Sequence, residues 1–575
     1  MKERAGMRSL AATWRMFRRG WSGELSTTEC TSAYQKTDGM NQPWQVSMLI
    51  LVTIYTLSYF LLLFNHGVFW DDWLVLYVDR LSLLKGTEQL GYPLLGYLHL
   101  VLRHIGLYAY RWIIFISYLA ASIATLKALS HIVKLDTHRR LCLALVFAVF
   151  PVNSVRIAVA NIHYAIAYAV FFIGMWLFSE FIDRGGVWLR LSSLVLIGSA
   201  SYFVNSLLFF CILVPAIYIY AGPDCSSVRA TVIRLKQIPE FILLPPVVFS
   251  LKQLSKPFGG YAAYNEVSFH YLASCPRALA ASFYTSFLQV IVYGFKVSLS
   301  SWTGICTTIL LTLSIGWLLR RSLIAYIQCS RVQSVSKGAN CEKPNVRTCF
   351  VNLLVGALMF ALAVTPYISV GKRPNLYDWN SRHQLLVPLG AAWMIVYGLD
   401  LLFGRWRARA YVLAALIAVF VLSNIDNCAQ FQRDAYKQES LLRHFANDPA
   451  IREGSSFVVD DQTHYLDANQ RQYRFYEYAG MLYAVFGEES RFAIRLDEVK
   501  SFPETAEYWS PGTLLGGFNG SQPNRMIRVT EGPYHVDASN LIKLMLDERV
   551  NPVKYEHEIW DITRVQVVEY TGQIH

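Results

Sequence analysis

The chain has 575 residues, of which 54% are hydrophobic and only 16% are charged. Soluble globular domains carry about 25% charged residues, so this composition, with a mean hydropathy of +0.31, excludes an ordinary soluble domain and indicates a polytopic membrane protein. The net charge of +12 does not predict a nucleic-acid partner, because lysine and arginine in membrane proteins mainly mark cytoplasmic loops.

The chain begins with a polar, basic segment, residues 1–44, which lacks the short apolar core of a secretory signal. We expect it to be a cytoplasmic N-terminal arm. Apolar stretches that could cross a bilayer fill residues 45–425. The candidate spans are 45–65, 106–128, 139–152, 162–181, 187–203, 204–221, 238–254, 301–321, 347–370, 384–403 and 408–425.

The stretch 279–298 could be a full span or an interfacial segment, because Gly294 and Lys296 interrupt its apolar run. The lysines and arginines of the other loops decide between the two. If it is interfacial or re-entrant, all strongly basic segments lie on the cytoplasmic side, with about eleven spans, the N-terminus inside and the C-terminus outside. The basic segments are the arm, 127–140, 229–236, 320–347 and 405–409. The outer loops are then 66–105, 151–163, 255–300 and 371–383.

The composition changes near residue 426, where acidic residues begin to exceed basic ones and apolar runs become short. The segments SFVVDD, RFAIRL, MIRVT and EIWDITRVQVVEY are typical of strands. The segment 538–550 has helical spacing, with Ser539 or Asn540 as the expected cap. We therefore predict a C-terminal extracytoplasmic α/β domain over residues 426–575.

Two adjacent carboxylates, Asp71 and Asp72, stand in GVFWDDWLVLY, where the first span should end. Acids at such a depth are costly and usually functional. Capping the following helix would need only one of them, and Asp72 is the better placed for that role. Crowded carboxylates beside aromatic rings should include one with a raised pKa, which suits a general base near neutral pH.

This acidic pair after the first span, in a chain of about eleven spans with a C-terminal outer domain, resembles the GT-C superfamily of membrane glycosyltransferases. Members include protein O-mannosyltransferases, the lipid A aminoarabinose transferase and mycobacterial arabinosyltransferases. The resemblance implies that a sugar moves from a polyprenyl-phosphate carrier to an acceptor hydroxyl on the outer side of the membrane. It also implies that Asp71 or Asp72 is the catalytic acid of the first outer loop.

Two departures from the family narrow this expectation. The segment FPVNSVRIAVANIHY is similar to a second outer segment of some O-mannosyltransferase relatives, but Val155 and Arg156 stand where those relatives often carry an acid. A second catalytic acid is therefore not expected there. The WWD-type signature of oligosaccharyltransferases is absent, so transfer of a whole oligosaccharide to asparagine is not expected either.

The phosphate of such a donor needs cations, and Arg382 and His383 precede a candidate span at the depth of the lipid headgroups. Lys372 and Arg373 lie in the same outer loop, against the usual charge bias. We predict that these four residues bind the donor phosphate. The alternative is that Arg382 only extends along the span toward the interface.

The loop 255–278 contains Gly259 and Gly260, tyrosines and basic residues, and it could be a lid that excludes water or an interfacial connector. The Asp460–Asp461 pair is expected to make a turn at the end of a strand rather than a metal site. Further candidate substrate contacts are Arg156, His163, Lys256, Tyr261, Tyr264, His270 and Arg277.

We therefore predict an α-helical, multi-pass GT-C-like glycosyltransferase of cell-envelope glycan biosynthesis in a bacterial inner or plasma membrane. Its expected partners are the lipid bilayer, a polyprenyl-phosphate-sugar and a glycan, lipid-linked glycan or protein acceptor. A lipid-diphosphate glycan polymerase or ligase, and a non-enzymatic lipid-linked sugar transporter or flippase, are the alternatives. A divalent cation (Mg²⁺, Mn²⁺ or Ca²⁺) is left open, with Asp71 and Asp72 as its candidate ligands.

Overall fold

A computed structural model describes residues 42–571 except 133–134, 222–227, 263–266, 335–345, 375, 377–378, 404–405, 489 and 502–521. Nearly all of the predicted N-terminal arm and the candidate contact Tyr264 lie outside the described residues.

Among the described residues, seven helical segments are long and apolar enough to cross a membrane, as a polytopic helical membrane protein requires. They are Trp44–Phe64, Leu107–Ser130, Val159–Arg184, Cys275–Leu299, Trp302–Ser322, Val346–Ile368 and Ala408–Asn447. Shorter apolar helices occupy Val187–Phe203, Ser206–Ile219 and Val387–Leu402. The count of about eleven spans stays a prediction.

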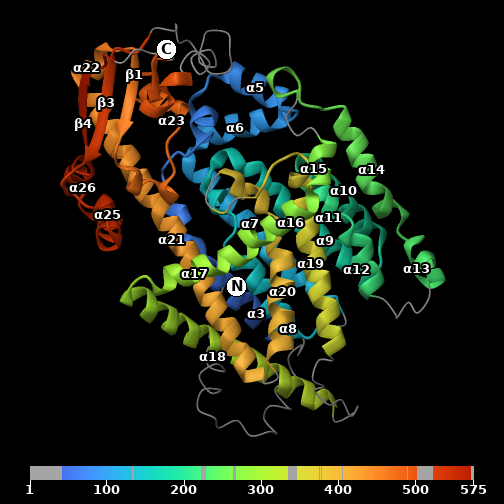
Figure 1. Cartoon of the computed structure of the whole chain (residues 1–575). Coiled ribbons are helices and arrows are strands. Elements are labelled where there is room, and N and C mark those ends of the chain that lie inside the picture. The colour runs from blue at the N-terminus through green and yellow to red at the C-terminus, as the bar shows by residue number, and fades with distance from the viewer. Residues whose placement is uncertain are drawn as a thin grey trace, which may run out of the picture.

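The helices of this bundle are drawn in Figure 1. They are α3 (Gln42–Tyr59), α7 (Leu107–Ser130), α8 (Thr137–Val149), α9 (Ile162–Arg184), α10 (Val187–Phe203), α11 (Ser206–Phe210), α12 (Leu213–Ala221), α13 (Val228–Leu235), α14 (Pro239–Gln253), α16 (Cys275–Phe283), α17 (Gln289–Leu299), α18 (Trp302–Ser334), α19 (Val346–Ile368), α20 (Val387–Leu402) and α21 (Trp406–Asn447).

Helix α8 lies at the centre of the bundle, packed against α3, α7, α20 and α21. Every residue from 141 to 149 is buried, because this run is apolar on all sides of the helix. With 13 residues, α8 is about 20 Å long, shorter than a full span.

The ambiguous stretch 279–298 forms part of one continuous helical segment, Cys275–Leu299, in which a π-helical turn at Tyr284–Leu288 joins α16 to α17. The segment is long enough to cross a membrane. In the view of Figure 1, α17 runs obliquely to α19 and α20.

Short helices gather at the end of the bundle that carries the sheet, and α18 lies toward the opposite end (Figure 1). They include α4 (Asp72–Tyr77), α5 (Arg80–Gln89), α6 (Pro93–Ile105) and α15 (Phe269–Ala273). Three 3-10 turns lie beside these helices: η2 (Ser154–Ile157), η3 (Val159–Asn161) and η6 (Trp379–Gln384). Turn η2 packs on η6, and turn η3 packs on α4.

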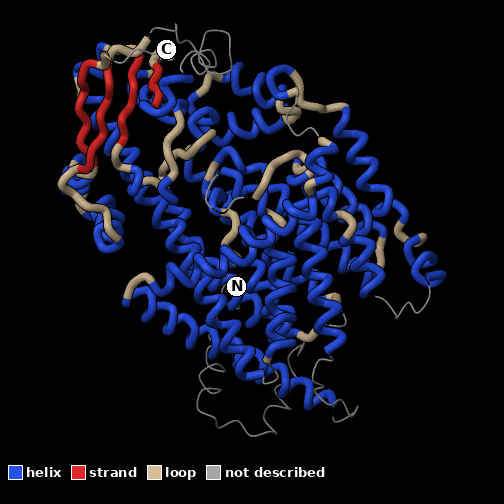
Figure 2. The backbone as a smooth tube through the Cα atoms, viewed as in Figure 1, coloured by secondary structure: helices blue, strands red, loops and turns tan. Residues whose placement is uncertain are grey.

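The C-terminal part contains a four-stranded sheet in the order β2-β1-β3-β4, seen as red strands in Figure 2. Strand β1 pairs in parallel with β2 and β3, and β4 pairs antiparallel with β3. The strands are β1 (Ser456–Asp461), β2 (Phe492–Arg495), β3 (Arg525–Glu531) and β4 (Thr563–Glu569), and the accompanying helices are α22 (Pro449–Glu453), α23 (Phe475–Phe486), α25 (Ala538–Val550) and α26 (Pro552–Trp560).

All four predicted strand segments contain a strand, and the helix predicted over 538–550 is α25. Its cap is Asp537, whose carboxylate accepts from the N–H of Asn540, so the expectation of Ser539 or Asn540 as the cap was wrong. Helix α21 continues unbroken for 42 residues, about 63 Å, through residue 426. The change in composition there therefore does not end a helix, and α21 links the bundle directly to the sheet.

Candidate functional site

Three segments that are far apart in the sequence meet at the sheet end of the bundle. We call their described residues, 65–77, 151–161, 376 and 379–384, the loop junction. The hydroxyl of Ser154 lies 2.9 Å from that of Ser381 and donates to the carbonyl of Leu376 over 3.0 Å. The N–H of Ala160 donates to Oδ1 of Asp72 over 2.8 Å. The first and second predicted outer loops are thus joined through Asp72, and the second and the last through Ser381.

Asp72 is the fully buried member of the acid pair. Its two carboxylate oxygens accept from the N–H groups of Ala160 and Phe69. Burial raises the pKa of Asp72 to about 7, against the opposing effects of Arg111 and these N–H groups. The buried Arg111 guanidinium itself donates to the carbonyls of Asn65 and Gly67. Asp72 therefore holds the segment 65–77 in place.

The expectation that Asp72 caps the next helix was wrong. Helix α4 begins at Asp72, and the residue in the cap position is Asp71, which makes no side-chain capping bond. The Asp72 carboxylate is unavailable for capping because it reaches back to Phe69 and across to Ala160.

Asp71 is the half-buried member of the pair. Burial raises its pKa, while the nearby Arg382, a hydrogen bond from Tyr476 and the charge of Arg474 act in the opposite direction. The structure thus brings the predicted acid and the predicted phosphate ligand Arg382 together. A raised carboxylate pKa beside a cation gives a group that can accept a proton near an anionic ligand.

The four predicted phosphate ligands have different surroundings. Arg382 is half-buried, and its guanidinium carbon lies 4.3 Å from the centroid of the Trp379 ring. His383 is 2% exposed and packs on Tyr367 with ring centroids 4.5 Å apart. Burial, with the charges of Arg382 and Lys372, lowers the pKa of His383 to about 2, so it is neutral and adds no positive charge. Lys372 is half-buried and Arg373 exposed.

The C-terminal part contacts the residue before the acid pair through Glu477, which is fully buried in α23. Its Oε1 accepts from the N–H of Trp70 over 3.1 Å, and both of its oxygens accept from Arg471. Trp70 has a backbone φ of 51°, in the left-handed region that few tryptophans adopt. Its ring lies 4.8 Å from the Arg471 guanidinium carbon. Glu477 and Arg471 therefore fix the strained residue that precedes Asp71.

Sequence reasoning missed Arg111, Glu477 and Arg471, and it gave Tyr476 no specific role. A charged residue within the predicted span 106–128 is costly, so Arg111 carried a detectable signal. Glu477 and Arg471 lie in a segment of mixed composition that does not distinguish them from surface residues.

The other candidate contacts have different surroundings. Arg156 stacks between Tyr59 and Tyr118, and the ring of His163 lies 4.2 Å from that of Tyr164. Lys256, His270 and Arg277 are exposed, and Tyr261 is half-buried.

The predicted lid, 255–278, bridges two parts of the bundle. The N–H of Phe258 donates to the carbonyl of Gln89 at the end of α5, and that of Ser268 donates to the carbonyl of Ser369 beyond α19. Tyr271 covers Gly371, where a Cβ would meet its ring at 2.5 Å. Gly371 also has a φ of +74°, so this close contact requires glycine.

The turn predicted at the end of this strand is confirmed for Asp461, which accepts from the N–H and hydroxyl of Thr463, whereas the Asp460 carboxylate pairs with Arg528. Asp461, His464 and Asp467 lie close enough together to hold a metal ion. The buried ammonium of Lys437, however, lies 2.7 Å from Asp461 and 2.6 Å from Asp467. Burial raises the pKa of Asp461, but Lys437 and Thr463 outweigh it and bring the pKa to about 2. Lys437 thus already supplies the positive charge that these acids need.

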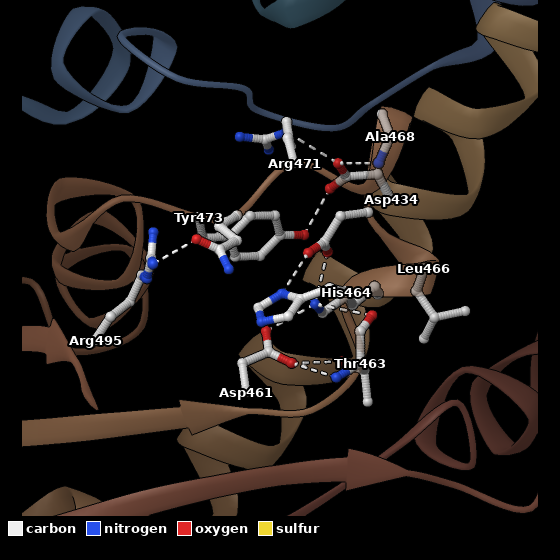
Figure 3. A network of polar contacts seen from close by, with 12 residues as sticks. Asp434, Asp461, Thr463, His464, Leu466, Ala468, Arg471, Tyr473 and Arg495 are labelled. Atoms are coloured by element: carbon white, nitrogen blue, oxygen red, sulfur yellow. Dashed lines mark hydrogen bonds and ion pairs between the residues drawn. The ribbon is translucent and has the colours of Figure 1, made fainter. Parts of the chain in front are cut away.

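Next to this cluster, Asp434 of α21 joins the segment that leads into α23 (Figure 3). Its carboxylate accepts from the guanidinium of Arg471, the N–H of Ala468 and the hydroxyl of Tyr473. Asp434 and Tyr473 are fully buried, and the three hydrogen bonds to the Asp434 carboxylate hold these side chains in one arrangement. The position of Arg471, and through it that of Trp70, is therefore fixed from α21.

Comparison of the chain with protein-family models and with curated proteins finds no match in either case. The function is therefore inferred from the chemistry of the loop junction.

Proposed function

We propose that the protein is an inverting glycosyltransferase that moves a sugar from a polyprenyl-phosphate donor to an acceptor hydroxyl, with Asp71 as the general base. The observation that carries the proposal is the position of Asp71. Its half-buried carboxylate has a raised pKa, accepts from Tyr476 and lies beside Arg382. A base beside a cation suits a reaction in which a hydroxyl loses a proton and a phosphate leaves.

In this mechanism Asp71 takes the proton of the acceptor hydroxyl while the oxygen of that hydroxyl bonds to the anomeric carbon of the sugar. The bond between that carbon and the phosphate oxygen breaks, and the phosphate leaves with the electron pair. Arg382 stabilises the leaving phosphate through charge-assisted hydrogen bonds. Tyr476 orients the carboxylate, and Asp72 keeps the loop in place. No covalent intermediate with the protein forms, so the anomeric configuration inverts.

A divalent cation fits this site poorly. Both oxygens of Asp72 accept backbone N–H groups, and Asp71 accepts from Tyr476 and faces Arg382 and Arg474. A Mg²⁺ or Ca²⁺ ion prefers several oxygen ligands and no neighbouring guanidinium groups. The mechanism therefore uses Arg382, rather than a metal ion, against the phosphate charge.

The proposed setting is the outer face of the membrane, with the loop junction at headgroup depth and the sheet domain extracytoplasmic. At this depth the lipid tail of the donor would stay in the bilayer while the donor phosphate reaches Arg382. The acceptor would be a glycan, a lipid-linked glycan or a protein.

The test is to reconstitute the purified protein in a bilayer with a polyprenyl-phosphate-linked sugar and candidate acceptors. The proposal predicts release of polyprenyl monophosphate and a product of inverted configuration. A lipid-diphosphate ligase would act only on a diphosphate donor, and a transporter or flippase would move the lipid without cleaving it. Either of those outcomes would contradict the proposal.

A further inference from the structure

An exposed apolar stripe runs along the helical hairpin that α25 and α26 form in the C-terminal part. Ile542, Leu546 and Val550 follow one another at intervals of four residues on α25, so they lie on one side of that helix. All three are exposed, Val550 by 81%, and Val553 at the start of α26 is 71% exposed. Another side of α25 packs into a core shared with α21 and α26, so the hairpin does not need the stripe for its own folding.

The tip of the hairpin lies at the end of the first candidate membrane span. The guanidinium carbon of Arg549 lies 4.6 Å from the ring centroid of Phe64, the last residue of the apolar segment Trp44–Phe64. Val550 follows Arg549 directly, and Val553 is three residues further on. The two valines of the stripe therefore lie near the level at which the first span ends.

Contacts with α21 hold the hairpin in this position. Helices α25 and α26 lie beside α21 on the bundle side of the sheet, whereas α22 lies at the other end of the sheet (Figure 1). The hydroxyl of Tyr436 in α21 donates to the Glu548 carboxylate over 3.3 Å. The ring of Tyr436 packs on that of Tyr555 in α26, with centroids 5.9 Å apart. The hairpin thus extends from the sheet toward the bundle.

The charged side chains of the hairpin leave the stripe apolar. Lys543 donates to Glu558 and Lys554 donates to Asp547, each over 2.7 Å, so these four groups join α25 to α26. Arg549 borders the stripe, and a long arginine side chain can keep its charge at a lipid interface while its apolar stem lies deeper. An exposed apolar surface with charged borders marks an interaction site, and beside the end of a span its partner is the lipid interface.

We infer that the α25–α26 hairpin docks on the membrane surface and inserts Val550 and Val553 among the lipids. The partner is the bilayer that holds the spans of the same chain, because the stripe begins where the first span ends. Through α21, this docking would hold the C-terminal part at a fixed height above the bilayer. The inference depends neither on the proposed transfer reaction nor on the side of the membrane that carries the sheet.

The test introduces the photoreactive amino acid p-benzoylphenylalanine at one position of the full chain in phosphatidylcholine vesicles. Illumination joins this side chain to its neighbour, and mass spectrometry identifies the adduct. Introduced in place of Val550 or Leu546, it should yield phosphatidylcholine adducts. Glu453, an exposed residue of α22, is the control position at the other end of the sheet, and it should yield no lipid adduct.

The adducts also distinguish the other possible partners of the stripe. A cross-link between two chains would identify a second copy as the partner, and a cross-link to another segment of the same chain would show that the protein covers the stripe itself. Either result, or the absence of a lipid adduct at Val550, would overturn the inference.

A double variant tests the tip directly. With the photoreactive residue in place of Leu546, Val550→Asp together with Val553→Asp should abolish the lipid adduct, because charged side chains are costly to insert among lipids. Both side chains are exposed, so the fold should persist, and a melting curve checks it. The matched control Val550→Ile together with Val553→Ile keeps the tip apolar and should retain the adduct. An undiminished adduct in the folded aspartate variant would show that the tip does not enter the bilayer.

Discussion

The backbone N–H of Trp70 donates a hydrogen bond to Oε1 of Glu477 over 3.1 Å, although 407 positions separate the two residues. Through this bond the C-terminal part of the chain sets the conformation of the loop that carries Asp71. Tyr476, the neighbour of Glu477, completes the contact with a hydrogen bond to the Asp71 carboxylate. The C-terminal part thus contributes directly to the candidate site.

Replacing Glu477 with Gln should destabilise the protein strongly. The change removes one partner of the buried Arg471 and weakens the tie to Trp70, and loss of one partner of a buried ion pair costs about 3–5 kcal/mol. Glu488→Gln is the matched control, since Glu488 pairs with Arg491 but is 56% exposed, and such a pair is worth about 0–1 kcal/mol. Thermal unfolding in one detergent measures both, and equal shifts would contradict a structural role for the Trp70–Glu477 contact.

The acid limb of the pH–rate profile should follow the pKa of Asp71. A base must be ionised, so the transfer rate should fall as the pH drops through a pKa raised above its ordinary 3.8. Arg382 and Tyr476 both oppose that rise, so Arg382→Ala and Tyr476→Phe should each move the limb to higher pH. Replacing the exposed Arg80 should leave it in place. A limb that moves to lower pH in either variant would exclude Asp71 as the titrating base.

Asp72→Asn should gain stability relative to the wild type as the pH rises. The folded-state pKa of Asp72 is about 7, above its ordinary 3.8, so the folded protein binds this proton more tightly than the unfolded chain. The wild type therefore loses this contribution to stability between about pH 4 and pH 7, whereas Asn does not titrate. Melting curves of both proteins at pH 5 and pH 8 test this. If Asp72→Asn instead became less stable than the wild type on going from pH 5 to pH 8, the ionised form of Asp72 would be the one that the fold stabilises, and the prediction would be wrong.

The proposed orientation makes a separate prediction. A side-specific reporter fused after residue 575 should report the outer side, and one inserted within 320–347 should report the cytoplasmic side, because that segment is rich in lysine and arginine. A substituted cysteine near residue 71 should be labelled from the same side as the C-terminal reporter. Two reporters on one side would overturn the orientation.

Local patterns predicted much of the fold. Apolar runs gave helices such as α3, α7 and α9, and SFVVDD gave β1, because hydropathy and alternation are read within one segment. The helix that spans residue 426 was not predicted, since the change in composition there reflects new surroundings along α21 rather than a change of structure.

The candidate site was predicted only in part. Asp71 and Arg382 carry local signals, a charge beside an apolar run, and the structure brings them together. Their partners depend on contacts between distant segments. Asp72 has the sequence signature of a helix cap, yet its carboxylate accepts the N–H of Ala160, 88 positions away. A pattern of neighbouring residues cannot predict a hydrogen bond to so distant a partner.

The most direct test of the central claim is the transfer rate of Asp71→Asn with a synthetic polyprenyl-phosphate sugar. Asn keeps the shape of the side chain and can still accept from Tyr476, but it cannot take a proton. The proposal predicts a rate about 10²–10⁴-fold below that of the wild type in a variant whose melting curve shows that it is folded, and a smaller loss for Asp72→Asn. Wild-type transfer by folded Asp71→Asn would contradict the role of Asp71 as the catalytic base.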